Sequence, residues 1–198
     1  MHVSLFNYIA NYIQLNDVVK TSHSEAFAHD FIKKNTLFEK AGHVPELLHF
    51  IVSGFVLRYY LDDFSNEIVT DINRGVGFLT TYNHFLNNTI SPKKYIETVK
   101  DVEILQINRL NVFALLAQHS IMQEFQSNLS LKMSNDNRQR AIDLAALPAK
   151  ELYSKFMNEN PSIMQNVPPC TYCFLFVHDT TKPKSPKKKH KITFFTIW

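Results

Sequence analysis

The stretch LLHFIVSGFVLRYYLDDFSNEIVTDI, residues 47–72, decides the fold class of this chain. Two apolar runs, Leu47–Ser53 and Phe55–Leu61, meet at Gly54, and a third run, Glu67–Ile72, follows a polar loop. Each run is short, rich in Val, Ile, Phe and Tyr, and bounded by turn residues, a pattern typical of β-strands. Gly54 suits a sharp reversal because a positive φ costs glycine little. We therefore predict three consecutive strands here.

The predicted strands continue on both sides of this stretch. Phe31–Glu39 lies before it, and Lys94–Val99 and Val102–Ile107 lie after it. Short strands at regular spacing, with turns between them, indicate a β-roll or sandwich. Before the strands, the periodicity of apolar residues is helical. Residues 4–14 predict a short amphipathic helix, and Asn16 is placed to cap a second one.

A long helix is predicted after the strands. Residues 119–147 contain neither glycine nor proline, and Ile121, Phe125, Leu129 and Met133 recur at intervals of four. At about 1.5 Å per residue, such a helix is too long for a small β-domain to cover. We expect its apolar stripe to pair with the same helix of a second subunit, giving a homodimer. The alternative is that the helix folds back on its own domain.

Charge is distributed unevenly along the chain. The net charge of the 198 residues is +3, yet six lysines and no acid lie between Lys182 and Lys191. This leaves 15 basic and 18 acidic groups in residues 1–181, so the body of the chain gives no sign of a basic nucleic-acid surface. No apolar run is long enough to span a membrane, and Met1–Ser4 does not begin a signal peptide. We expect a cytoplasmic protein without a membrane partner.

Four segments resemble the Crp/Fnr family of bacterial transcription regulators, particularly its Bacteroidetes-type members. They are Leu37–Gly42, Phe50–Tyr60 with its Ile-Val-Ser-Gly element and Arg-Tyr-Tyr strand, Tyr95–Leu105, and Glu151–Pro161. The resemblance covers residues 5–168. It implies an α+β fold: a cyclic nucleotide-binding-like β-roll (a double-stranded β-helix, or jelly roll) with flanking helices, a long C-terminal dimerisation helix and a truncated winged-helix remnant.

The resemblance also implies a division of the chain into four parts. Residues 1–118 correspond to the sensory domain and residues 119–147 to the dimerisation helix. Residues 148–168, which include a predicted helix Pro148–Asn158, correspond to the first part of a winged-helix DNA-binding domain. Residues 169–198 form an aberrant basic tail that we expect to be disordered. The implied function is that of a homodimeric transcription regulator whose β-roll senses a small ligand.

The ligand site departs from the family's cyclic-AMP pattern. In family members that bind cyclic AMP, a Gly-Glu pair contacts the ribose, and an Arg-Ser/Thr-Ala unit holds the cyclic phosphate. Here no Glu follows Gly75 or Gly77, and Pro92 stands where the Arg would be. We therefore expect no cofactor, and an unidentified small molecule or no ligand in place of cyclic AMP.

The candidates for lining a ligand pocket are Gly75, Gly77, Phe78, Lys93, Lys94 and Tyr95. For the two lysines a solvated loop is the simpler interpretation, because their ammonium groups are point charges and not a planar fork.

The tail Cys170–Trp198 has no counterpart in the family. The resemblance implies a helix-turn-helix there, whose second helix enters the major groove, but CTYCFLFVHDTTKPKSPKKKHKITFFTIW contains no pair of amphipathic helices. The genetic code permits codons for Cys170–Lys191 that, read one base later, encode AHIASFLCMTPQSLSRLRKNTK, which contains the family's motif. Our hypothesis is that a frameshift replaced the motif, so that sequence-specific DNA binding is defective. The nucleotide sequence tests this hypothesis.

Other interpretations of the tail stay open. Cys170, Cys173, His178 and His190 have a zinc-like composition, but the histidines are spaced too widely for a usual finger, and we predict no metal site. The lysines are able to contact phosphates without sequence specificity. A disordered, solvated tail is the default.

The sequence contains no catalytic constellation. It has no G-x-S-x-G, no phosphate-binding G-x-x-x-x-G-K and no H-E-x-x-H. We predict no catalytic residues and no enzyme activity. The alternative to a regulator is a ligand-binding or dimerisation module that does not contact DNA.

Overall fold

A computed structural model describes residues 2–65 and 67–167. These residues form an α+β structure in which two four-stranded antiparallel sheets make a jelly roll, with strand orders β1-β8-β3-β6 and β2-β7-β4-β5. The strands are β1 (Ala28–Ile32), β2 (Leu37–Glu39), β3 (Leu47–Ser53), β4 (Phe55–Leu61), β5 (Glu67–Arg74), β6 (Gly77–Leu79), β7 (Lys94–Thr98) and β8 (Val102–Asn108). The helices are α1 (Val3–Ala10), α2 (Asp17–Ala26), α3 (Tyr82–Asn87), α4 (Arg109–Gln118), α5 (Ser120–Ala146), α6 (Ala149–Glu159) and α7 (Pro161–Asn166).

The stretch Leu47–Ile72 folds as predicted. β3 and β4 have the expected bounds, and β5 extends the third run by two residues. Gly54 joins β3 to β4 with a φ of +106°. A Cβ atom at this position would lie 2.7 Å from the carbonyl oxygen of Asp101 and 2.9 Å from the Cα of Val102. Glycine is therefore required at this reversal both by backbone conformation and by space.

The prediction of a single strand over Phe31–Glu39 is wrong. β1 pairs with β8 in one sheet, whereas β2 pairs with β7 in the other. The chain crosses between the sheets through Asn35, which has a φ of +60°. The Asp101 carboxylate supports this crossing by accepting a 2.8 Å hydrogen bond from the backbone N–H of Lys34. Two short elements, β6 and α3, were not predicted.

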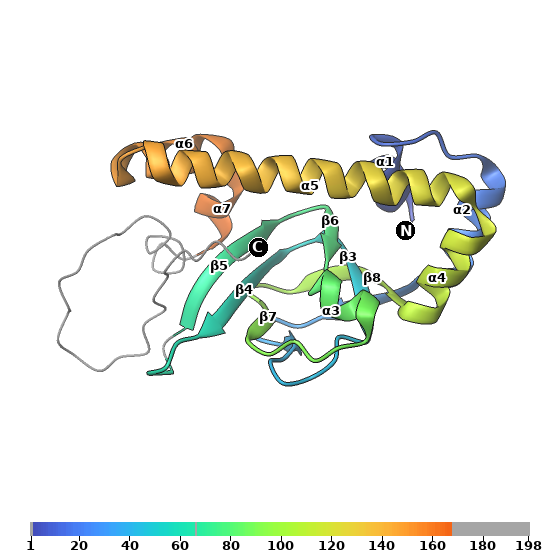
Figure 1. The fold of residues 1–198 in the computed structure, drawn as a ribbon, viewed down its shortest axis with the longest axis horizontal. Helices are drawn as coiled ribbons and strands as arrows, with labels where there is room; N and C mark the ends of the chain where they lie inside the picture. The colour runs from blue at the N-terminus through green and yellow to red at the C-terminus, as the bar shows by residue number, and fades with distance from the viewer. Residues whose placement is uncertain (1, 66, 168–198) are drawn as a thin grey trace.

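The predicted helices are present. Asn16 caps α2, its side-chain oxygen accepting a 2.9 Å bond from the backbone N–H of Val19. α5 is 27 residues long and runs along the length of the molecule above the roll, with α1, α2 and α4 at one end and α6 and α7 at the other (Figure 1). α6 begins directly after Pro148.

Three apolar layers hold the structure together. One lies between the two sheets, and a second lies between the sheet β1-β8-β3-β6 and the helices α1, α2, α4 and α5. The third lies between the sheet β2-β7-β4-β5 and the helices α6 and α7. Its buried members are Leu57, Tyr59, Val69, Ile72, Met157, Ile163 and Val167. The elements on both sides of α5 in the chain, α4 before it and α6 and α7 after it, therefore pack on the roll.

The structure corrects the role expected for the apolar stripe of α5. Phe125 is buried in the second layer, and Ile121 and Leu129 pack against that layer. These three side chains face the chain's own roll, because helical periodicity places them on the side of α5 that covers the sheet. Met133 is about half exposed, at 49%. The contacts of Ile121, Phe125 and Leu129 therefore agree with the alternative prediction, in which the helix folds back on its own domain.

Candidate functional site

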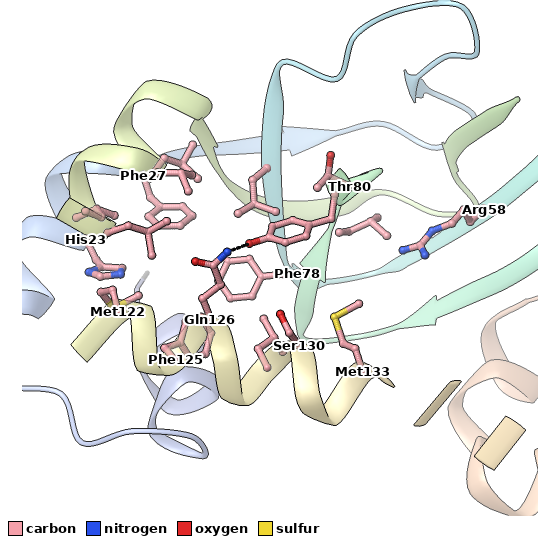
Figure 2. Close-up of a pocket in the computed structure, with 18 residues that line it drawn as sticks. His23, Phe27, Arg58, Phe78, Thr80, Met122, Phe125, Gln126, Ser130 and Met133 are labelled. Carbon is pink, nitrogen blue, oxygen red and sulfur yellow. Dashed lines mark hydrogen bonds between the residues drawn. The ribbon is translucent and has the colours of Figure 1, made fainter. Parts of the chain in front are cut away.

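A cavity of about 130 Å³ lies between the jelly roll and the helices α4 and α5 (Figure 2). One wall is formed by residues of the sheet β1-β8-β3-β6, by Arg58 of β4 and by the end of α2, and the opposite wall is α5. The lining residues are His23, Phe27, Leu48, Arg58, Phe78, Leu79, Thr80, Tyr82, Ile107, Val112, Leu115, Leu116, Met122, Phe125, Gln126, Leu129, Ser130 and Met133. Most of them are apolar, as in small-molecule sites generally.

Aromatic rings order the wall around β6. Phe78 contacts Phe50 and Tyr8 edge-on, with ring centroids 5.1 and 5.8 Å apart, and lies 5.9 Å from the ring of Phe125 on α5. Aromatic pairs of this kind have preferred geometries and contribute about 0.5–1.5 kcal/mol beyond the burial of their area. The β6 segment and the first half of α5 are therefore held in register across the cavity.

One hydrogen bond spans the cavity. The Gln126 amide donates a 3.0 Å bond to the hydroxyl oxygen of Tyr82, which begins α3 (Figure 2). Burial raises the pKa of the Tyr82 hydroxyl. The bond links α5 to the segment that follows β6, so a molecule entering here would contact both.

The α3 segment is anchored to the roll by a buried carboxylate. Glu39 of β2 accepts a 3.0 Å bond from the backbone N–H of Thr81 and a 2.7 Å bond from its hydroxyl. Thr81 is the residue that precedes α3, and its N–H is one of the donors that a helix start leaves unpaired. Glu39 thus fixes the position of Thr80 and Tyr82 at the cavity.

The two ends of the cavity differ in polarity. At one end His23 donates a 2.8 Å bond to the carbonyl of Val19, and burial lowers its pKa, which favours the neutral ring. At the other end lie Arg58 and Thr80. Arg58 Nε and Thr80 Oγ1 are both buried and have no hydrogen-bond partner among the described residues.

Arg58 belongs to a group of charges on the roll. Its Nη1 lies 3.9 Å from Asp71 Oδ2, and Asp71 Oδ1 in turn lies 3.7 Å from Nη1 of Arg140 on α5. Burial, followed by the neighbouring Arg58, lowers the pKa of Lys94 on β7. This corner of the molecule therefore places one carboxylate between two guanidinium groups, with a further amine nearby.

Of the six residues predicted to line a ligand pocket, Phe78 lines this cavity and the other five do not. Gly75, with a φ of +99°, forms the turn before β6, and Gly77 lies against Tyr8. Lys93 is exposed. Tyr95 stacks on Tyr59, with ring centroids 5.1 Å apart, in the layer beneath α6 and α7.

The alternation of side chains along β7 explains why the residues predicted there do not line one pocket. Neighbouring residues of a strand point to opposite faces, so Lys94 and Tyr95 cannot both face one pocket.

The sequence contained signals for the residues that were missed. Arg58 is a single cation inside the otherwise apolar run Phe55–Leu61. Gln126 and Ser130 are polar positions four residues apart on the apolar face of a helix. A polar residue in a buried pattern needs a partner or a ligand, but which of them meet at one place depends on the packing.

None of the helices in the described part of the chain is long and apolar enough to cross a membrane. Within residues 2–65 and 67–167, no group of three or more His, Cys, Asp and Glu side chains is placed to hold a metal ion. The predicted tail features, including Cys170, Cys173 and the proposed frameshift, lie outside the described residues.

No protein-family model matches the chain. No curated protein matches it either.

Solved structures do match the chain. A transcriptional regulator of the Crp/Fnr family from Eubacterium rectale has a TM-score of 0.59 at 20% identity, covering 78% of this chain and 74% of that one. The catabolite activator protein of Thermus thermophilus has a TM-score of 0.56 at 15% identity, covering 68% of this chain and 61% of that one. The c-di-GMP-responsive global regulator CLP of Xanthomonas campestris has a TM-score of 0.55 at 17% identity, covering 73% and 72%.

These neighbours are Crp/Fnr-type regulators, and the match spans about three fifths to three quarters of their lengths. At identities of 20% or less the likeness concerns the fold. The described part of this chain has the cyclic nucleotide-binding jelly-roll fold of Crp/Fnr regulators, with the long helix that follows it.

Proposed function

We propose that the chain is a subunit of a Crp/Fnr-like, cytoplasmic transcription regulator that is not an enzyme, senses a small ligand and is defective in sequence-specific DNA binding. The observation that carries this proposal is the shared cavity. Residues of the roll and residues of α5 line the same space, and α5 leads directly to α6 and α7. A ligand in the cavity would therefore contact the helix that connects the sensory part to the C-terminal part.

The homodimer is part of this proposal, but on a different face of α5 from the one first expected. Leu131 and Ile142 are 63% and 51% exposed. They are 11 residues apart, close to three helical turns, and so lie on one face of α5, opposite the face that covers the roll. Two such helices packed side by side would bury both residues. Sedimentation equilibrium should detect a dimer that Leu131→Asp with Ile142→Asp converts to a monomer.

The DNA-binding defect is tested by restoring the reading frame. The chain as given and a variant in which residues 170–191 are replaced by AHIASFLCMTPQSLSRLRKNTK are each used to select from a pool of random duplexes at about 150 mM salt, because phosphate contacts alone weaken at that ionic strength. We expect the given chain to enrich no sequence and the variant to enrich a two-fold symmetric one.

Each opposite result has a defined meaning. Enrichment by the given chain would overturn the defect. Failure of the restored variant to enrich any sequence would favour the second candidate, a ligand-binding or dimerisation module with no DNA contact. That candidate also has support, since the cavity and the exposed face of α5 lie entirely within residues 2–167.

A further inference from the structure

We propose that the cavity binds a small hydrophobic carboxylic acid, with its ring or alkyl chain between α4, α5 and the sheet β1-β8-β3-β6 and its carboxylate at Arg58 and Thr80. This inference rests on the proposed function in one respect, that the cavity is the sensory site. It adds the chemical class of the ligand.

The size of the cavity selects a small molecule. Its volume of about 130 Å³ is close to that of cavities of about 150 Å³ that accommodate benzene. One ring or a short chain with one polar group fits this space. The walls provide apolar contacts from several elements, including Leu115 of α4, Ile107 of β8 and Met122 of α5.

The polar end of the cavity is suited to a ligand group that accepts hydrogen bonds. Arg58 Nε and the hydroxyl of Thr80 are buried donors without a hydrogen-bond partner among the described residues, and Thr80 is only 8% exposed. Unpaired buried donors are costly, and a carboxylate is the acceptor that forms the strongest bonds with a guanidinium. Figure 2 shows Arg58 extending from β4 toward the other lining residues at the end where Thr80 and Met133 lie.

The charges around this end also select an anion. Arg58 is the one Lys or Arg among the described residues that line the cavity. Its ion pair with Asp71 is long, at 3.9 Å, and Asp71 is shared with Arg140. The Glu39 carboxylate, which anchors the residue next to Thr80, is already bonded to Thr81. A bound carboxylate would pair with Arg58, which a cationic molecule would not do.

The opposite end of the cavity does not compete for the carboxylate. His23 is neutral at pH 7 because burial lowers its pKa, and its Nδ1 is bonded to the carbonyl of Val19. Of the remaining polar groups, Gln126 and Tyr82 bond to each other, and Ser130 is exposed. The only end at which a charged head group gains partners is therefore the Arg58 end of the described cavity.

The test is isothermal titration calorimetry of the full chain with benzoate, hexanoate, benzyl alcohol and cyclic AMP. We expect benzoate or hexanoate to bind at least tenfold more tightly than benzyl alcohol. Arg58→Met should weaken binding of the acid tenfold or more and leave benzyl alcohol within twofold. The matched control is Lys33→Met, which removes a cation whose side chain is 82% exposed, and it should change neither affinity.

A second variant tests the apolar part without touching the charges. Leu115→Trp fills the space beside α4 and should abolish binding of the acids and of benzyl alcohol alike. Circular dichroism melting curves establish that both variants are folded.

The inference would be overturned by no binding of either acid, by equal affinity for benzoate and benzyl alcohol, or by full retention of acid binding in Arg58→Met. Cyclic AMP binding more tightly than both acids would also overturn it, while leaving a sensory function intact. The DNA selection with the frame-restored variant is carried out without ligand. Its outcome therefore distinguishes failure of the proposed function from failure of this assignment.

Discussion

The two halves of α5 form one continuous helix but are held in different ways. Residues 120–133 pack on the roll: Met122 and Phe125 are buried, and Gln126, Leu129 and Ser130 line the cavity. Residues 134–139 are all exposed. The helix regains contact with the roll at Arg140, through its 3.1 Å bond to the carbonyl of Thr70 and its ion pair with Asp71.

In the proposed sensory function, the first half of α5 would contact a ligand, because it is part of the apolar core that lines the cavity. The second half is joined to the roll by charged groups and to α6 by the ion pair between Asp143 and Lys155, which lowers the pKa of the Asp143 carboxyl and raises that of the Lys155 amine. Apolar burial is worth several kcal/mol per large side chain, whereas partly exposed ion pairs are worth about 1 kcal/mol or less.

The largest effect is expected from truncating the buried half. Phe125→Ala removes a ring that contacts Phe78 and Tyr12 and should lower the free energy of unfolding by about 3–5 kcal/mol. Asn137→Ala, in the exposed second half of the same helix, should change it by about 0.5 kcal/mol or less. Urea unfolding monitored by circular dichroism measures both. Equal losses would remove the distinction between the two halves.

Lowering the pH should destabilise the buried core, which contains His49, before it affects the exposed second half of α5. Burial lowers the pKa of His49 on β3 from 6.5 to about 4, so between these values the unfolded chain binds a proton that the folded chain does not. Stability is full above pH 6.5 and falls as the pH decreases to about 4, by about 3 kcal/mol from this residue. The buried His23 acts in the same direction.

The control for this acid effect is a second histidine. His49→Leu should flatten the pH dependence of the free energy of unfolding, and the same change at the exposed His43 should not. An unchanged slope in His49→Leu would contradict the assignment.

A smaller effect is expected at the hydrogen bond that crosses the cavity. Tyr82→Phe leaves the Gln126 amide without its 3.0 Å acceptor and should cost about 1 kcal/mol. Gln126→Leu in the same background should recover part of the loss, because both partners are then apolar. A double-mutant cycle in urea measures the coupling between the two residues. Additive losses would show that the bond does not join α5 to α3 energetically.

The smallest effect is expected in the second half of α5. Arg140→Met removes its contacts with Thr70 and Asp71, both of which involve partly exposed groups, and should cost about 0.2–1 kcal/mol. The loss should shrink at high salt, because screening weakens exposed ion pairs. Urea unfolding at 0.05 M and 1 M sodium chloride checks this. A loss as large as that of Phe125→Ala would show that the charged contact holds α5 on the roll as strongly as the buried ring does.

Local sequence determined most of the secondary structure. The Leu47–Leu61 stretch fixes β3 and β4 because alternating burial, aromatic content and a glycine at the reversal all act within a few residues. Asn16 fixes the start of α2 in the same way. The errors occurred where tertiary contacts override local pattern. Phe31–Glu39 was predicted as one strand, and the three-residue β6 pairs with β3 only because the two meet in the folded sheet.

The candidate site could be predicted only in part for the same reason. The sequence located the segment around Phe78, but it could not indicate that Arg58 of β4, Thr80 after β6 and Gln126 of α5 line one space. Those residues are far apart along the chain, and the strand order β2-β7-β4-β5, with the packing of α5 on the other sheet, brings them together.

The sequence by itself determined that this chain builds a β-roll followed by a long helix, because side-chain periodicity and turn residues act locally. It also determined that the cyclic-AMP pattern is absent, since Pro92 occupies the place of the Arg. Only the tertiary structure decided which face of α5 is buried. The sequence contains one apolar stripe that is able to meet either a second subunit or the chain's own roll. The choice between them depends on the total apolar area buried across elements that lie far apart in the chain.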